Sequence, residues 1–281
     1  MMGFVRAFLR NPGGPIGLVL LIAVVGVALL APLLAPVDPW EMVGAPFEPP
    51  LSPDLPLGSD TMGRDIASGL AHGARVSLAI GMSSTLAALL VGVVIGATAG
   101  WFGGLVDAVL MRVAELFQTI PGFILAVLLV ATLGPSLSHE ILAIAAISWP
   151  PLARLTRGEF LRLRNRDFVR AAACQGERPA ALVLRHILPN AVAPLIVTGA
   201  LTVATAILIE SALSFLGLGD PNLMTWGFLI GSGRSVIRLA WWMSVFPGIA
   251  IFLTVLALNL VGEGLSDALN PRLARQRGGA A

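Results

Sequence analysis

The stretch FLRLRNRDFVRAAACQGERPAALVLRHILPN, residues 160–190, decides how this chain is organised, because it is strongly charged in an otherwise apolar sequence. It holds six arginines. Each of them would cost about 2.5 to 3.5 kcal/mol at the centre of a membrane helix. The stretch is therefore predicted to lie outside the membrane, between two apolar spans.

The order of residues within this stretch predicts two short helices that meet at a bend. FVRAAACQ favours a helix whose alanines keep one surface thin. Gly176 can adopt the left-handed conformation that ends a helix, and Pro179 suits the first turn of the next one. Pro189 is expected to end that second helix, and Asn190 to cap the span that follows. Residues 160–190 are thus predicted to form a rigid elbow at the membrane surface.

The composition outside the elbow indicates a polytopic membrane protein. Of 281 residues, 56% are apolar and only 12% are charged, with a mean hydropathy of +0.87, whereas soluble domains are about half apolar and a quarter charged. A bilayer core requires about 20 apolar residues per helix. The sequence predicts an all-α fold with six transmembrane helices, the third of them kinked at Pro121. The expected spans are residues 16–35, 76–100, 107–132, 140–155, 191–217 and 241–265.

The distribution of arginine predicts the topology. With both termini in the cytoplasm, most arginines lie on the cytoplasmic side, as the positive-inside rule requires. These are Arg6, Arg10, Arg112, the cluster within residues 154–185, Arg272, Arg275 and Arg277. Arg64, Arg75, Arg234 and Arg238 fall outside. We expect residues 1–75 to form a signal-anchor helix and an extracytoplasmic loop, 76–265 a core with five transmembrane helices, and 266–281 a cytoplasmic tail. A cleaved signal peptide is the alternative for the first span.

Several kinds of site are not predicted. Cys174 is the only cysteine, so no internal disulfide can form, and we expect it to be a small buried apolar residue. The three histidines show neither metal-ligand spacing nor a nucleophile partner, so no catalytic site, metal site or bound cofactor is expected. Without any lysine the chain cannot contain the phosphate-binding pattern GxxxxGK[ST]. A net charge of +2 gives little attraction for nucleic acid.

Polar residues in the last two spans are candidates for a substrate path. Thr198, Thr202 and Thr205 share one face of the fifth span, where they either line a passage or pack and bond back to the helix backbone. Glu210 and Asn259 would extend a polar seam, although Glu210 suits a place near the outer surface equally well.

Several motifs together resemble one transporter family. RAAACQG, followed ten residues after Gly176 by HILPN, is similar to the loop by which ABC-transporter permeases dock on their ATP-binding subunits. PLGSDTMGRD, AHGARVSLAIG, IPGFILAVLLVATLG, SFLGLGDPNLMTWG and WWMSVFPGIAIFLTVLALNLVGEGLSDALNPR extend the resemblance over nearly the whole chain. They resemble the second, C-type permease of dipeptide, oligopeptide and nickel importers, which have the type I importer permease fold.

The resemblance implies a subunit that forms half of a translocation pathway in a prokaryotic plasma (inner) membrane. The implied partners are a B-type permease, two ATPase subunits that bind ATP and Mg²⁺, and an extracytoplasmic solute-binding protein. The elbow would follow the ATPases as ATP closes them. The implied coupling residues are Arg170, Ala171, Ala172, Ala173, Gly176, Arg178, Arg185, His186, Pro189 and Asn190. Arg170 departs from the acidic residue usual in the family, so we expect it to face an acidic group or to make no ionic contact.

Other interpretations remain open from the sequence. The elbow would also suit a topogenic anchor that meets anionic lipid. For the cargo, nickel or another small solute is the alternative to peptide. A stand-alone secondary transporter is less favoured because no inverted repeat of broken spans is visible. A membrane enzyme would need a catalytic constellation, which the sequence lacks. Peptide is the preferred cargo, since the spans contain no histidine or thiolate seam for a soft metal ion.

Overall fold

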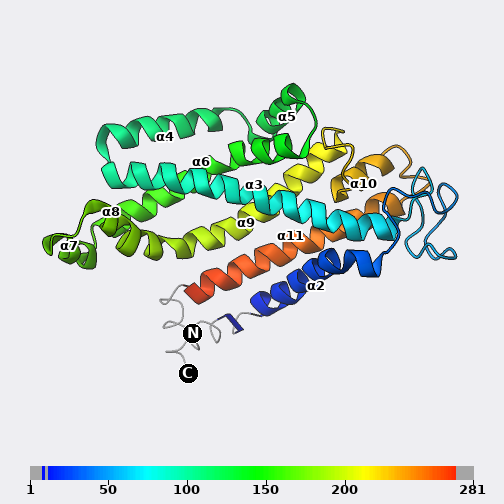
Figure 1. Cartoon of the computed structure of the whole chain (residues 1–281), viewed down its shortest axis with the longest axis horizontal. Helices are drawn as coiled ribbons and strands as arrows, with labels where there is room; N and C mark the ends of the chain where they lie inside the picture. Colours follow the sequence, from blue (N-terminus) through cyan, green and yellow to red (C-terminus); the bar gives the residue numbers. More distant parts are fainter. Residues whose placement is uncertain (1–7, 10–11, 270–281) are drawn as a thin grey trace.

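The computed structural model describes residues 8–9 and 12–269, which are almost entirely helical (Figure 1). No β-strand occurs in this part of the chain, only isolated bridges in the loop before α3. The elements are α2 (Gly13–Leu34), α3 (Ile66–Phe102), α4 (Gly104–Thr119), α5 (Gly122–Leu133), α6 (Leu137–Arg164), α7 (Asp167–Cys174), α8 (Pro179–Ala181), the π-helical turn η1 (Leu182–Ile187), α9 (Leu188–Phe215), α10 (Trp226–Gly233) and α11 (Trp242–Leu269). The all-α prediction is confirmed.

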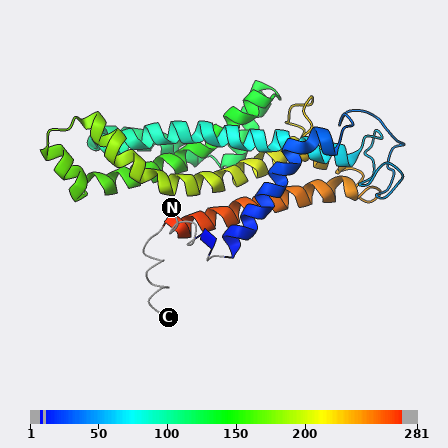
Figure 2. The same ribbon diagram turned by 60° about the horizontal axis from the view of Figure 1, so that its bottom comes forward.

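The long helices run roughly along one axis, so the molecule has two distinct ends (Figures 1 and 2). Helix α7 projects at one of them, the elbow end. The loop of residues 35–65 and helix α10 lie at the other, the loop end. Helix α3 packs against both α6 and α9, and α2 lies along α11.

Four helices in the described residues are long and apolar enough to cross a membrane: α2, α3, the continuous helix Pro179–Phe215 and α11. The pair α4 and α5 counts as a fifth if it is one broken span. The expected kink at Pro121 is in fact a break of 82°. Ile120 before the proline is extended, as the proline ring favours. Residues 140–155 lie inside α6, where polar residues bound the apolar stretch on both sides, so this span stays a prediction.

The prediction that Pro189 ends a helix is wrong. One helix runs from Pro179 to Phe215, and Pro189 lies in the first turn of α9. The wider π-helical turn directly before it displaces the carbonyl groups that a proline ring would otherwise meet. Asn190 does not act as an N-cap either, because its side-chain amide donates to the carbonyl of His186 at 2.6 Å.

Glycines on α3 allow α6 to lie unusually close. A Cβ at Gly96 would lie 2.3 Å from the Ala153 carbonyl oxygen, and one at Gly92 only 2.8 Å from Leu152 Cβ. Small residues four positions apart permit such backbone contact between membrane helices. This close packing fixes α6, which carries the elbow, against α3.

Two aspartates order the loop end where it enters α3. Asp60 Oδ1 accepts hydrogen bonds from the backbone N–H groups of Met62 and Arg64 at 2.7 and 2.9 Å. Asp65 caps the next helix through the N–H groups of Ala67 and Ser68. That helix is α3 itself, which begins at Ile66 rather than at the expected residue 76, because no break separates the cap from the span.

Candidate functional site

The elbow, residues 160–190, bends at Gly176. This residue has φ +84°, and its N–H and that of Glu177 bond to the carbonyls of Ala173 and Ala172. Such a pair of bonds is a Schellman motif, which ends α7. A Cβ at Gly176 would meet nothing within 4 Å. Glycine is therefore required for its backbone conformation, as expected, and not for space.

A small apolar core joins the elbow to the long helices. Val169 of α7 is 3% exposed and belongs to this core. Its other buried members are Phe160, Leu163, Ile187 and Ala191, from α6, η1 and α9. The core makes α7, α6 and the start of α9 a single packed unit.

The predicted coupling residues lie mostly on the elbow surface. Ala172 is buried and His186 half-buried, whereas the other eight are exposed: Arg170, Ala171, Ala173, Gly176, Arg178, Arg185, Pro189 and Asn190. The side chains of Arg170, Arg178 and Arg185 form no ion pair or hydrogen bond within the described residues. Cys174 is also exposed, which corrects the expectation of burial. Helix α7 stands away from the bundle, so few of its residues can face inward.

A polar contact braces the bend from inside. Glu177 Oε2 lies 2.9 Å from His186 Nε2, so the turn after Gly176 is tied to η1. Sequence reasoning placed His186 in the elbow but missed Glu177. Their separation of nine residues indicates a contact only once the fold of the bend is known.

Part of the arginine cluster is structural. The Arg157 guanidinium donates two hydrogen bonds to the Asp107 carboxylate of α4. Nε donates to Oδ1, and Nη2 donates to Oδ2 at 2.6 Å. Arg164 Nη1 donates to the carbonyls of Gly100 and Trp101 at 3.0 and 3.1 Å. These two arginines therefore join α6 to α4 and to the end of α3, a role that sequence reasoning did not separate from surface charge.

The candidate path threonines line a pocket of about 350 Å³ between α5, α6 and α9. Its lining residues are Gly122, Phe123, Ile147, Ser148, Pro151, Thr198, Leu201, Thr202, Thr205 and Ile209. None of them is charged. The hydroxyls of Thr202 and Thr205 also bond to the carbonyls of Thr198 and Leu201. Two of the threonines thus bond to their own helix while all three line the pocket, and their place in a passage stays a prediction.

Glu210 and Asn259 do not line this pocket. Glu210 has no exposed surface and accepts hydrogen bonds from the hydroxyls of Ser77, Ser211 and Ser214 at 3.3, 3.3 and 3.0 Å. Asn259 is exposed on α11, where its amide donates to the Val255 carbonyl. In this conformation neither residue joins the threonine face.

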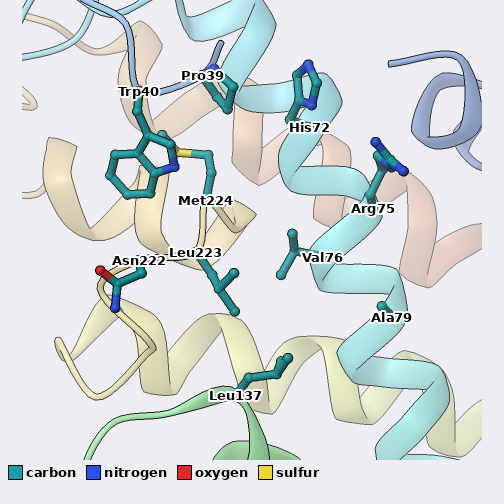
Figure 3. Close-up of a pocket in the computed structure, with 10 residues that line it drawn as sticks. All are labelled: Pro39, Trp40, His72, Arg75, Val76, Ala79, Leu137, Asn222, Leu223 and Met224. Carbon is teal, nitrogen blue, oxygen red and sulfur yellow. The ribbon is translucent and has the colours of Figure 1, made fainter. Parts of the chain in front are cut away.

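A second pocket, of about 490 Å³, opens at the loop end (Figure 3). It is lined by Pro39, Trp40, His72, Arg75, Val76, Ala79, Leu137, Asn222, Leu223 and Met224. Figure 3 shows α3 as one wall and Asn222, Leu223 and Met224 as another. Sequence reasoning missed this pocket because its walls come from four distant segments. Within the described residues, no group of three or more His, Cys, Asp or Glu side chains is arranged to hold a metal ion.

Comparisons with known proteins agree with this architecture. A model of "Binding-protein-dependent transport system inner membrane component" matches residues 92–275, and one of the N-terminal TM domain of oligopeptide transport permease C matches residues 2–50. The chain is 41% identical to the di/tripeptide transport system permease protein DppC of Pseudomonas aeruginosa (strain UCBPP-PA14), over 96% of this chain and 91% of that protein. It is 35% identical to the oligopeptide transport system permease protein OppC of Bacillus subtilis (strain 168), over 95% and 88%.

A solved structure shares the fold. The chain matches an inward-facing structure of the MetNI methionine ABC transporter with a TM-score of 0.59 and 19% identity, over 72% of this chain and 96% of that one. Together with the family model, this match confirms the expected type I importer permease fold. The chain belongs to the family of inner membrane components of binding-protein-dependent transport systems.

Proposed function

We propose that the chain is the C-type permease subunit of an ATP-driven importer of dipeptides and oligopeptides. The observation that carries the proposal is the elbow, a glycine-bent projection at one end of a permease fold that is braced by Glu177 and His186. Three of its exposed arginine side chains have no ion-pair partner among the described residues. The names of the relatives, which are peptide permeases, support peptide as the cargo.

The elbow transmits force in this proposal, while other subunits bind the nucleotide. Since the chain has no lysine for a phosphate-binding loop, ATP and Mg²⁺ belong to two partner ATPase subunits. Exposed Ala171 and Ala173 allow close docking in a cleft of the ATPase. Buried Val169 passes the displacement to α6 and α9 through the shared core, because close-packed side chains move together.

The threonine pocket is the proposed part of the substrate path, opposite a B-type permease partner. Its hydroxyls and apolar surface suit the uncharged main chain of a peptide. No histidine or cysteine lines it, so it lacks the ligands that a soft metal ion prefers. Peptide is delivered by an extracytoplasmic solute-binding protein in this proposal.

The elbow end is proposed to face the cytoplasm of a prokaryotic cell and the loop end the exterior. In this orientation residues 1–75 supply the anchor and outer loop, 76–265 the core, and 266–281 the tail, although α3 already begins at Ile66. Arg6, Arg10, Arg272, Arg275 and Arg277, which support this orientation by their charge, lie outside the described residues.

Two measurements test the proposal. Purified complex with its solute-binding protein, reconstituted in vesicles, should accumulate labelled dipeptide only when ATP is present on the elbow side. Uptake that is indifferent to ATP would overturn it. Cys174, exposed on α7 and the only cysteine, reports the orientation. An impermeant thiol reagent should leave Cys174 unlabelled in intact cells and should label it once the cells are permeabilised. Labelling in intact cells would place the elbow on the outer side and contradict the proposed orientation.

A further inference from the structure

Glu210 is a fully buried acid that the proposed path does not use. It lies near the end of α9, just before residues 216–241, which connect α9 to α11 and contain α10; we call these residues the α10 segment. No ion pair involving Glu210 occurs in the part of the chain that the structure describes. A buried carboxylate without a cation requires several donors, and here hydroxyls supply them.

These donors connect Glu210 to α3 and to the start of α10. The Trp226 backbone N–H donates to Ser77 Oγ at 3.2 Å, and the Ser77 hydroxyl donates to Glu210 Oε2 at 3.3 Å. The hydroxyl of Thr225, the N-cap of α10, also lies against the carboxylate. One carboxylate thus holds groups from α3, α9 and the α10 segment together.

The α10 segment approaches α9 more closely than side chains would allow. A Cβ at Gly227 would lie 2.6 Å from Ser211 Cα, and one at Gly219 only 2.4 Å from Ser214 Oγ. The same Gly219 position is 3.2 Å from Oε1 of Glu140, a residue of α6 that is 1% exposed. This oxygen has no hydrogen-bond partner in the described residues. Helix α6 therefore also reaches the cluster, and the segment has little room to shift.

Trp226 converts this polar contact into packing. Its indole N–H donates to the Leu70 carbonyl at 3.0 Å, and its buried ring packs in a core with residues of α2, α3, α9 and α11. The residues immediately before Thr225 form a wall of the loop-end pocket (Figure 3). The position of Trp226 therefore determines where that wall stands relative to α3.

We propose that Glu210 is a positioning residue for transport: it fastens the α10 segment to α3 and α9 and so sets the shape of the loop-end pocket. The inference rests on the proposed function, because the pocket then lies at the outer entrance of the path. Glu210 acts here through Ser77 and Trp226, without touching the cargo.

The test compares Glu210→Ala and Glu210→Gln in the full reconstituted complex. Glu210→Ala should reduce peptide uptake by about tenfold, because the hydroxyls of Ser77 and Ser214 lose a buried acceptor. Glu210→Gln should keep most uptake, since its amide oxygen still accepts. Ser77→Ala, which removes one donor to Glu210 together with the bridge to Trp226, should act in the same direction as Glu210→Ala. Ser83→Ala, exposed on the same helix, is the matched control.

A covalent tie separates positioning from other roles of the acid. Gly231 is adjacent to Phe215, since a Cβ at Gly231 would lie 3.2 Å from Phe215 Cα. Cysteines at these two positions, in a chain whose Cys174 is replaced by serine, are introduced to join the α10 segment to α9 without Glu210. In the Glu210→Ala chain, uptake should recover when this disulfide forms and fall again on reduction. The same pair in the Glu210 chain controls for effects of the disulfide itself.

The possible outcomes decide the question. Uptake by Glu210→Ala at the wild-type rate, or no recovery once the disulfide is shown to have formed, overturns the inference. If Glu210→Ala does not assemble, Ser77→Ala with and without the disulfide gives the same decision. Failure of the proposed function is distinct, because the unsubstituted complex would then show no ATP-dependent uptake.

Discussion

Replacing Gly176 should uncouple ATP hydrolysis from uptake, to a degree set by the backbone alone. A residue with a Cβ at φ +84° costs roughly 1–2 kcal/mol, and a β-branched residue costs more. Because nothing lies within 4 Å of the added atom, this conformational cost is the whole local effect. It lowers the population of the bent elbow about 5- to 30-fold relative to alternatives. Asparagine tolerates this conformation, so the expected order of impairment is Asn, then Ala, then Val.

The assay measures peptide taken up per ATP hydrolysed by the reconstituted complex, together with complex yield. Gly176→Val should hydrolyse ATP but import little, and Gly176→Asn should remain near wild type. Gly158→Val is the matched control, because Gly158 is also exposed with nothing within 4 Å but lies within α6 without a positive φ. Normal uptake per ATP by Gly176→Val would refute the reasoning, as would impairment of equal size in Asn, Ala and Val.

Three further substitutions test the packing and charge of the same bundle. Gly96→Leu should lower the thermal stability of the complex, because its Cβ would collide with the Ala153 carbonyl. Gly26→Leu is the control, since a Cβ at Gly26 of α2 meets nothing within 4 Å, and equal melting curves for the two variants would contradict this reasoning. Glu177→Gln should lower uptake per ATP by weakening the Glu177–His186 contact, and His186→Gln should add nothing in the double variant. Additive losses would mean that the pair does not act as a unit. Arg170→Glu should reduce complex yield and uptake through a lost acidic partner, and unchanged values would make Arg170 a bystander.

Local rules predicted the features that one stretch of chain determines by itself. The bend at Gly176 is such a feature, and it is confirmed. The cap at Asp65 and the close glycine contacts of α3 likewise follow from residue type and spacing. The arginine cluster also located the elbow correctly. These features need no knowledge of which distant segment packs against them.

Prolines and buried polar groups show where such rules fail. Pro121 breaks the chain by 82°, while Pro189 sits within a continuous helix. The difference lies in the turn before each: extended at Ile120, π-helical before Pro189. The sequence places Glu210 in a polar seam with the path residues. Its hydrogen-bond donors come partly from Ser77, 133 positions away, and the sequence gives no sign of this contact. Only tertiary structure reveals such partners, and the same holds for the pocket in Figure 3.

The uninterrupted helix from Pro179 to Phe215 has a mechanical consequence. Its 37 residues follow a path roughly 55 Å long that includes the π-helical turn η1, with the elbow at one end, the threonine face midway and Glu210 near the other end. Because no loop interrupts this path, a displacement imposed at the elbow is carried along the helix to the Glu210 end. Opening at one surface and closing at the opposite surface would then be one synchronous event rather than two steps in succession.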